Sequence, residues 1–245
     1  MTDIALAIAD ATIEERLSSL DWQGVASDLW ARGFASTSPV LTPEECEQLI
    51  ALFDDDARFR SRVDMARHRF GEGEYKYFAS PLPPVVQALR TGLYPPLAEV
   101  ANEWMRALGA SDEYSPTLDE FLARCAEAGQ TKPTPLLLHY EAGGYNCLHQ
   151  DIYGDVAFPM QVVVLLNRPG VDFDGGEFLL VEQRPRAQSV GEAVRLEQGS
   201  LLVFTTRARP VRGSKGFYRG NMRHGVSRVR RGRRYTLGVI FHDAR

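Results

Sequence analysis

The sequence predicts an α+β protein: a double-stranded β-helix, or jelly roll, with an N-terminal helical region packed outside it. Helix-capping patterns are concentrated before residue 130, whereas the chain after Pro133 consists of short β-rich runs separated by Gly, Pro, Asp and Asn. The spacing of these runs is typical of a sandwich or barrel and differs from that of alternating βαβ units. With 245 residues and 44% hydrophobic content, the chain is long enough to bury both parts as one integrated domain.

Residues 1–130 are expected to form the helical region and to carry a candidate substrate lid. Thr12, Thr42 and Thr117 each precede a Glu by three residues, which is the capping-box pattern of a helix start. Glycines follow several of the helix-like runs, where a left-handed C-terminal cap is expected. We expect helices over residues 13–32 in two pieces, 43–54, 84–108 with a break at Pro95-Pro96, and 118–128.

Residues 131–245 are expected to form the jelly-roll core. Period-two runs bounded by turn residues indicate strands rather than helices. The expected strands cover residues 135–140, 145–150, 158–167, 176–182, 200–206, 222–229 and 234–241. Because one face of each helix is apolar, the helices are expected to pack against the outside of this β core.

The composition is that of an ordinary soluble protein. No apolar run is long enough to span a bilayer and the first residues lack a signal-peptide pattern, so we expect a cytoplasmic protein without membrane association. Cys46, Cys125 and Cys147 are widely spaced, which argues against a disulfide framework or a metal pair, and they are interpreted as small buried residues. No obligate protein partner is evident.

The net charge of −4 conceals a strong asymmetry. Residues 200–245 hold eleven Arg and one Lys against one acid, a charge of +11, so that the other 199 residues carry −15. These cations either pair with the acids of the N-terminal part or form a positive surface that faces phosphates or another polyanion. The charge pattern alone leaves both interpretations open.

The segment 138–151 and a later histidine suggest a metal site. His149 and Asp151 lie two residues apart in an expected strand and therefore project from the same face. His224 lies in another expected strand, 73 residues further along. Two imidazoles and one carboxylate leave three positions open on an octahedral ion, as non-haem iron(II) oxygenases require. We predict that these three residues bind iron.

Ten residues after His224, Arg234 stands in a strand-like run that has little reason to bury a guanidinium. Arg234 and Thr236 share a face and can hold one carboxylate, the arginine through a bidentate pair and the threonine through its hydroxyl. A dicarboxylate cosubstrate requires such a grip at its distal end. For Tyr140, two interpretations stay open, a core aromatic residue or a cosubstrate contact.

A hairpin is expected to join the last two strands. A three-residue loop at 230–232 with Gly232 left-handed would place His224 opposite Gly238 and Arg228 beside Arg234. A glycine opposite the metal ligand would leave room for the ion, whereas an inward Arg228 would need an anion or a bulge.

Two histidines outside the triad are assigned other roles. His139 lacks a partner carboxylate and is interpreted as a core or pocket-wall residue. His242 lies near the end of the sequence and is expected at the surface.

Taken together, these residues resemble the 2-oxoglutarate/Fe(II) dioxygenase superfamily. The matching segments keep the order and spacing of that superfamily over roughly 130–245. They are Tyr140, Gly143, Leu148-His149-Gln150-Asp151, Asp174-Gly175-Gly176-Glu177-Phe178, His224 and Arg234-Tyr235-Thr236-Leu237. The whole chain, including residues 65–78, resembles the Oxygenase-NA group, which is related to the AlkB-like nucleic-acid demethylases.

The resemblance implies a function as well as a fold. It implies an Fe(II)/2-oxoglutarate-dependent dioxygenase that uses O2 and removes alkyl groups from damaged or modified nucleic acid bases, as a DNA repair demethylase does. Iron would be held by His149, Asp151 and His224, and 2-oxoglutarate by Arg234 with Thr236 and Tyr140. No further catalytic residue beyond the metal ligands is implied.

The sequence also departs from the AlkB pattern. Leu138 replaces an Asn, Ile240 replaces a second Arg, and the ten-residue spacing to Arg234 is that of prolyl-hydroxylase-like members. A 2-oxoglutarate-dependent hydroxylase of a protein side chain or small molecule is therefore the alternative. A jelly-roll binding module without catalysis is a third reading, which the complete triad disfavours.

For a nucleic acid substrate, a base must leave its stack to reach the iron, so basic and aromatic side chains are expected around the pocket. Residues of this kind are interleaved in the segment 67–78 and in the loop before His224. The candidates are Arg67, Arg69, Tyr75, Lys76, Tyr77, Arg212 and Arg219. The alternative is that 67–78 forms a strand packed on the core and that the arginines pair with acids elsewhere.

Overall fold

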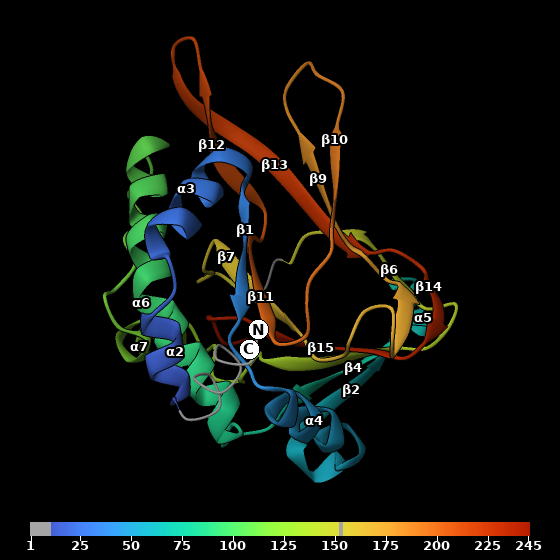
Figure 1. Cartoon of the computed structure of the whole chain (residues 1–245). Helices are drawn as coiled ribbons and strands as arrows, with labels where there is room; N and C mark the ends of the chain where they lie inside the picture. The colour runs from blue at the N-terminus through green and yellow to red at the C-terminus, as the bar shows by residue number, and fades with distance from the viewer. Residues whose placement is uncertain (1–10, 152–153) are drawn as a thin grey trace.

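Two antiparallel β-sheets face each other and form the jelly roll, as the computed structural model in Figure 1 shows for residues 11–151 and 154–245. The larger sheet has seven strands, in the order β1 (Phe34–Pro39), β11 (Ser200–Thr205), β7 (Met160–Leu165), β15 (Arg234–Val239), β5 (Leu136–Tyr140), β4 (Glu74–Phe78) and β2 (Phe59–Asp64). The jelly-roll expectation is thereby confirmed.

The smaller sheet carries the strands with the histidines. Its order is β10 (Val190–Val194), β9 (Phe178–Gln183), β13 (Gly216–Val226), β6 (Tyr145–His149) and β3 (Gly71–Glu72), and β12 (Ala208–Gly213) pairs with β13. Two short strands, β8 (Phe173–Gly175) and β14 (Val229–Gly232), pair separately.

The helices cover the outer face of the larger sheet (Figure 1). They are α2 (Ile13–Ser18), α3 (Trp22–Arg32), α4 (Pro43–Ala51), α6 (Pro84–Ala107) and α7 (Leu118–Glu127), with two 3-10 turns at Leu52–Asp54 and Asp56–Arg58. The short α5 (Met65–His68) lies instead beside β3 of the smaller sheet (Figure 1). Reciprocal capping boxes are present at Thr12 and Thr42, as expected. At Thr117 only the N-cap bond to the Glu120 amide is formed.

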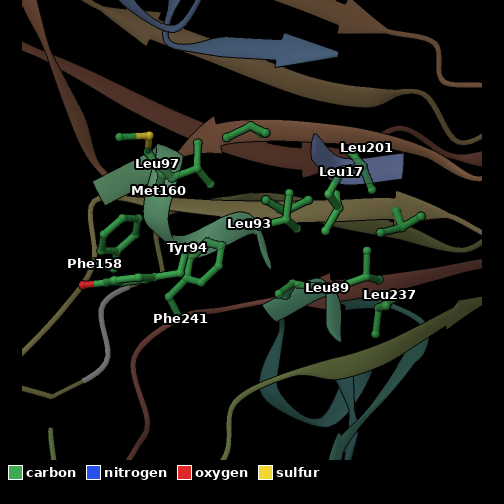
Figure 2. Close-up of a cluster of buried hydrophobic side chains, with 14 of the residues drawn as sticks. Leu17, Leu89, Leu93, Tyr94, Leu97, Phe158, Met160, Leu201, Leu237 and Phe241 are labelled. Atoms are coloured by element: carbon green, nitrogen blue, oxygen red, sulfur yellow. The ribbon is translucent and has the colours of Figure 1, made fainter. Parts of the chain in front are cut away.

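The expected break in the long helix is absent. α6 continues through Pro95 and Pro96, although each proline removes a backbone donor and crowds the preceding turn. Figure 2 shows the reason: Leu93, Tyr94 and Leu97 of this stretch lie in the apolar cluster between helices and sheet. Burying such side chains stabilises the fold by about 1.5–3 kcal/mol each, which offsets the local cost of the prolines.

Alternation along the strands separates two cores. In β7, Val162 and Val164 face the helices, whereas Val163 and Leu165 face the smaller sheet. Because successive residues of a strand point to opposite faces, Gln161 also faces the smaller sheet. The same alternation directs Arg234, Thr236 and Gly238 of β15 to the interior of the jelly roll, where they line a cavity.

The prediction of a hairpin between the last two strands is wrong. β15 pairs with β5 and β7 of the larger sheet, so that Gly238 lies opposite Leu136 and Val163 and not opposite His224. The chain passes from one sheet to the other after β14, as consecutive strands of a jelly roll do. Arg228 consequently lies outside, over the Tyr145 ring at 4.5 Å, and does not approach Arg234.

Several smaller expectations also change. Residues 71–78 form β3 and β4, which extend the two sheets, so this part of the candidate lid is strand. Cys46 and Cys125 are buried as expected, but Cys147 is exposed. His242 is 1% exposed and therefore belongs to the core, because its Nδ1 accepts the Phe158 amide at 3.2 Å. Among the described residues, no helix combines the length and apolarity needed to cross a membrane.

Candidate metal centre and cavity

Three potential metal ligands converge where β6 and β13 pair. His149 and His224 are direct partners across the two strands, and Asp151 follows His149 by two residues. Asp151 Oδ1 lies 3.5 Å from His149 Nε2, and its Oδ2 lies 3.2 Å from His224 Nε2. One ligand atom from each of the three residues falls within 4.8 Å of the others. The three side chains predicted from the sequence are therefore brought together.

The orientation of each ligand is set by its surroundings. His149 Nδ1 lies 2.7 Å from the Cys147 carbonyl oxygen and donates to it, which leaves the Nε2 lone pair for the centre. The His224 ring is stacked parallel to Phe178 at 5.8 Å and contacts Phe204 at 4.8 Å. Both rings are thus held with one nitrogen toward Asp151.

The charge states also suit a cation. Burial opposes ionisation of Asp151, but the two adjacent imidazoles hold the pKa of that carboxyl well below its usual range. Burial lowers the pKa of His224, which favours the neutral imidazole that metals bind. Burial also acts to lower the pKa of His149, but the adjacent Asp151 carboxylate outweighs it and raises that pKa, so a bound metal would displace a proton from this ring. A carboxylate and two neutral imidazoles are the donor set of the facial triad.

Gln161 of β7 is a member of this centre that the sequence analysis did not identify. Its side-chain amide donates to Asp151 Oδ2 at 2.6 Å and lies 3.4 Å from His224 Nε2, and the residue is 4% exposed. The available signal was a single amide within the apolar strand Met160–Leu165. Phe178 and Phe204, which flank His224, carried no such signal because both resemble ordinary core residues.

A cavity of about 470 Å³ opens beside the three ligands. Besides the triad and Gln161, it is lined by Arg234, Thr236 and Tyr140, all three of which were predicted as cosubstrate contacts. The remaining walls are largely apolar and aromatic. A cavity of this size, with a few convergent polar groups, is typical of a small-molecule site.

Arg234 is a buried cation without a counter-ion among the described residues. It is 2% exposed, and its Nε and Nη1 have no hydrogen-bond partner. The rings of Tyr140 and Phe173 lie 5.7 and 6.0 Å from its guanidinium carbon. Burial lowers the pKa of Arg234 to about 10. Buried charges are normally paired, so the site is suited to an anionic ligand.

Tyr140 and Thr236 complete the polar end of the cavity. Tyr140 is the direct partner of Arg234 across β5 and β15, and its hydroxyl accepts a hydrogen bond from the Asn146 amide at 3.3 Å. Burial raises the pKa of Tyr140 to about 12, so the phenol stays protonated and can donate. Thr236, two residues after Arg234, is 1% exposed and points to the same side.

The candidate substrate residues divide into two groups. Arg69, Tyr75 and Tyr77 line the cavity, as expected. Two further lining residues, Phe70 and Leu148, are 48% and 43% exposed, and the sequence analysis did not single them out. Large apolar side chains exposed beside a cavity are common at binding sites.

The other four candidates do not line the cavity in the described part of the chain. Lys76 is the clearest correction: its Nζ donates to the Phe53 carbonyl at 2.8 Å and pairs with Asp56 at 2.6 Å, because its side chain leaves the opposite face of β4 from Tyr75 and Tyr77. Arg67 pairs with Asp64 at 3.3 Å. The remaining two, Arg212 and Arg219, are exposed on the β12–β13 hairpin.

His139 is also a structural residue. Its ring stacks on Tyr235 at 4.2 Å with an angle of 10° between the planes, on the side of β5 that faces the helices. This agrees with the expectation of a core residue.

The chain matches one protein family and a related bacterial sequence. The model of the family named Oxygenase-NA, described as "Oxygenase, catalysing oxidative methylation of damaged DNA", matches residues 73–244. MT2286, an uncharacterized protein of Mycobacterium tuberculosis (strain CDC 1551 / Oshkosh), is 52% identical over 167 residues, which cover 68% of this chain and 72% of the relative.

Solved structures with the same fold include two oxygenases. An oxidoreductase of the 2OG-Fe(II) oxygenase family from Burkholderia pseudomallei superposes with a TM-score of 0.53 at 16% identity, over 91% of each chain. A prolyl hydroxylase from Trichoplax adhaerens, in complex with a hypoxia inducible factor peptide fragment, gives a TM-score of 0.53 at 16% identity, over 96% of this chain and 95% of the other. At these identities the likeness concerns the fold alone.

Proposed function

The chain belongs to the Oxygenase-NA family, and from this membership and the side chains that converge in the cavity we propose that it is an iron(II)- and 2-oxoglutarate-dependent oxygenase. One observation carries the proposal. The triad of His149, Asp151 and His224 shares a cavity with the buried, unpaired guanidinium of Arg234. A chelating dicarboxylate can bind such a site at both ends, because the metal has open coordination positions for one end and the guanidinium binds the carboxylate at the other.

The reaction proposed is a coupled oxidation. Iron held by the triad would supply the oxidising chemistry, with O2 and 2-oxoglutarate as the co-reactants. One oxygen atom of O2 enters succinate, formed from 2-oxoglutarate with loss of CO2, and the other converts a substrate C–H bond to C–OH. If the carbon is an N-methyl group, the N–CH2OH product releases formaldehyde and leaves N–H on the base.

The residues of the chain bind and orient the reactants. His149, Asp151 and His224 would hold the metal on one face, and Gln161 would fix the Asp151 carboxylate through its 2.6 Å hydrogen bond. Arg234 would bind the distal carboxylate of 2-oxoglutarate through its fork of N–H groups, with Thr236 adding its hydroxyl. The apolar walls would limit the access of water to the reacting atoms.

The substrate class that we propose is an N-alkylated nucleic acid base. The family description names damaged DNA and so supports a nucleic acid substrate, as does the character of the cavity wall. Tyr75 and Tyr77 offer aromatic faces for a base, while Arg69 and Phe70, at the exposed part of the wall, would contact the strand that carries it. Hydroxylation of a protein side chain or a small molecule is the alternative outcome of the same chemistry.

The proposed metal site is tested by iron content. The protein reconstituted with Fe(II) under anaerobic conditions is expected to retain one iron per chain after desalting and to form succinate from 2-oxoglutarate. His149→Ala, Asp151→Ala and His224→Ala should each lose the iron and the succinate while circular dichroism stays unchanged. His68→Ala, a histidine outside the cavity, serves as the matched control. Normal iron loading in any triad variant would remove that residue from the site.

The proposed substrate is tested by a direct screen. N-methylated single-stranded oligonucleotides and a peptide library are incubated with the reconstituted enzyme, and products are read by mass spectrometry. Loss of about 14 mass units from an oligonucleotide, which is one CH2 per methyl group removed, supports dealkylation. A gain of one oxygen on a peptide, without change in any oligonucleotide, would replace the nucleic acid substrate by a protein.

A further inference from the structure

The β12–β13 hairpin extends beyond the rest of the smaller sheet and carries an unusual excess of positive charge (Figure 1). Residues 207–223 contain six basic residues and no acid. Pairing between β13 and β9 ends at the partners Asn221 and Gln183, so the hairpin beyond this pair is joined only to itself along the ladder. None of this surface is used by the proposed chemistry.

One of the six cations holds the hairpin in place. Arg209 is 2% exposed, pairs with Glu182 at 2.9 Å and donates to the Trp30 carbonyl at 2.9 Å. These bonds connect β12 to β9 and to α3. The base of the hairpin is therefore fixed, and its exposed side chains have a defined position relative to the sheet.

The other cations have no such role. Arg207, Arg212, Lys215, Arg219 and Arg223 are exposed, and none of them forms an ion pair within the described ranges 11–151 and 154–245. Most exposed cations of the neighbouring segments are paired, as Arg184 is with Glu182 at 2.8 Å. Several unpaired cations on one hairpin produce a positive surface that favours a polyanion.

Along β13 the exposed residues form a regular row. Phe217, Arg219, Asn221 and Arg223 are exposed and alternate with residues of the opposite face, which are more buried. Since residues two apart in a strand lie about 7 Å from each other, Arg219 and Arg223 are roughly 13 Å apart. We call these four residues the exposed row. Two cations, an amide and an aromatic ring in line suit an extended strand of phosphates and bases.

The exposed row is connected to the cavity. Gln150 lines the cavity, and its amide donates to the carbonyl oxygens of Arg207 at 3.0 Å and Met222 at 2.7 Å. These two bonds join the cavity wall to the base of the hairpin, at the residue before β12 and within β13. Within β13, Arg223 and His224 are adjacent and face opposite sides of the strand, so the row begins one residue from the proposed metal ligand.

We propose that the exposed row binds the sugar-phosphate backbone of a single nucleic acid strand, on the nucleotides that flank the base in the cavity. This inference rests on the proposed function for the identity of the polymer. The flanking strand would pass the sheet edge at Gln150 and continue along β13. Arg219 and Arg223 would contact phosphates, and Phe217, already beside Arg212 at 5.9 Å, would receive a base.

The chemistry of the row favours nucleic acid over other anionic partners. The Phe217 ring packs against Trp30 at 5.6 Å but stays 38% exposed, and an acidic peptide bound by charge alone would not use this aromatic surface. Stacking of bases on an aromatic ring and release of counterions from the phosphate backbone together characterise the binding of single-stranded nucleic acids. The spacing along an extended β-strand also matches a linear polymer better than a compact anion.

The test measures binding of an unmodified, fluorescently labelled single-stranded oligonucleotide to iron-free protein from 50 to 200 mM salt. Each phosphate contact contributes about −0.7 to the log–log slope, so the double variant Arg219→Gln/Arg223→Gln should shallow the slope by about 1.4. Between these salt concentrations the wild type should therefore lose roughly sevenfold more affinity than the variant. Phe217→Ala should weaken binding without changing the slope.

The matched control removes the same charge elsewhere. Arg58→Gln/Arg62→Gln alters two arginines outside the cavity, one in the 3-10 turn Asp56–Arg58 and one in β2 of the larger sheet, which pair with Asp55 and Glu74. The control should keep the wild-type slope. Equal changes in both double variants, or none in either, would overturn the inference. The binding assay contains no iron, so it is independent of the oxygenase activity. If the protein does not bind the strand but still forms succinate once it is reconstituted with iron, the proposed role of the exposed row is rejected and the oxygenase assignment stands.

Discussion

Replacing Arg234 by methionine should stabilise the ligand-free protein and weaken 2-oxoglutarate binding, two effects of opposite sign from one change. Arg234 is 2% exposed and has unpartnered Nε and Nη1 atoms. Burial lowers its pKa to about 10, so at pH 7 the guanidinium stays charged in an environment that disfavours the charge. A cation held this way costs stability in the absence of an anion.

The magnitude follows from that lowering of the pKa. It corresponds to roughly 3 kcal/mol against the charged side chain. The variant also loses the ring contacts with Tyr140 and Phe173, which contribute about 0.5–2 kcal/mol. The net gain in the free energy of unfolding is therefore about 1–3 kcal/mol, and each kcal/mol raises the melting temperature by about 2–4 °C in a chain of this size. Methionine fills the space of the side-chain stem without introducing a polar group.

The effect on the cosubstrate is larger. Deleting one partner of a buried charge pair costs about 2–5 kcal/mol of binding, which weakens 2-oxoglutarate at least about 30-fold. Arg234→Lys should recover part of the affinity, because the charge returns without the planar fork. Isothermal titration with 2-oxoglutarate in the presence of a redox-inactive divalent metal measures both variants, and differential scanning calorimetry of the ligand-free protein measures the stability.

The matched control is Arg16, a buried arginine that has its counter-ion in the chain. Its Nη1 and Nη2 donate to Glu45 at 2.8 and 2.6 Å. Arg16→Met should lower the melting temperature, because Glu45 loses its partner, and should leave 2-oxoglutarate binding unchanged. If Arg234→Met destabilises the ligand-free protein as Arg16→Met does, or retains the wild-type affinity for 2-oxoglutarate, Arg234 is a structural residue and the anion site lies elsewhere.

Two further predictions concern single residues. Gln161→Leu removes the 2.6 Å hydrogen bond to Asp151 Oδ2. The affinity for iron, measured by competition with a chelator, should therefore fall about 10- to 100-fold while the fold is preserved. An unchanged affinity would show that the Asp151 carboxylate does not need this hydrogen bond. His242 is buried, and burial lowers its pKa to about 4, below the value near 6.5 of an unfolded histidine. Between these two pH values the folded chain therefore binds fewer protons than the unfolded chain. The free energy of unfolding should fall by up to roughly 3 kcal/mol as the pH falls from 6.5 to 4. His242→Gln should lack this component in denaturant titrations of the metal-free protein, and an identical pH dependence in variant and wild type would assign the loss to other groups.

Local patterns were sufficient for the parts of the site that lie within single strands. His149 and Asp151 follow the period-two rule, and Arg234 was recognisable as a guanidinium in an apolar strand. The strands around them were also located within a few residues, except that β13 begins at Gly216, earlier than expected. Gly-rich and basic composition concealed that extension, because hairpins of this kind resemble loops in sequence.

Long-range pairing was beyond such reasoning. The terminal hairpin was misassigned because the residues after β14 cross to the other sheet, and the partners of β15 lie about 70 and 100 residues earlier in the chain. The same limit applies to Lys76: its alternation with Tyr75 and Tyr77 is visible in the sequence, but which face lines the cavity depends on the pairing of β4 with β5. Gln161 could be assigned to Asp151 only once the two sheets were placed together.

The most direct measurement is the product balance of one reaction, with an N-methylated single-stranded oligonucleotide, 2-oxoglutarate, O2 and Fe(II). Succinate and formaldehyde are quantified together, with Asp151→Ala as the inactive reference. We expect both products in equal amounts, dependent on iron and absent from the variant. Failure to form succinate from 2-oxoglutarate with iron bound, or formation at the same rate by Asp151→Ala, would contradict the assignment of this cavity as an iron- and 2-oxoglutarate-dependent oxygenase site.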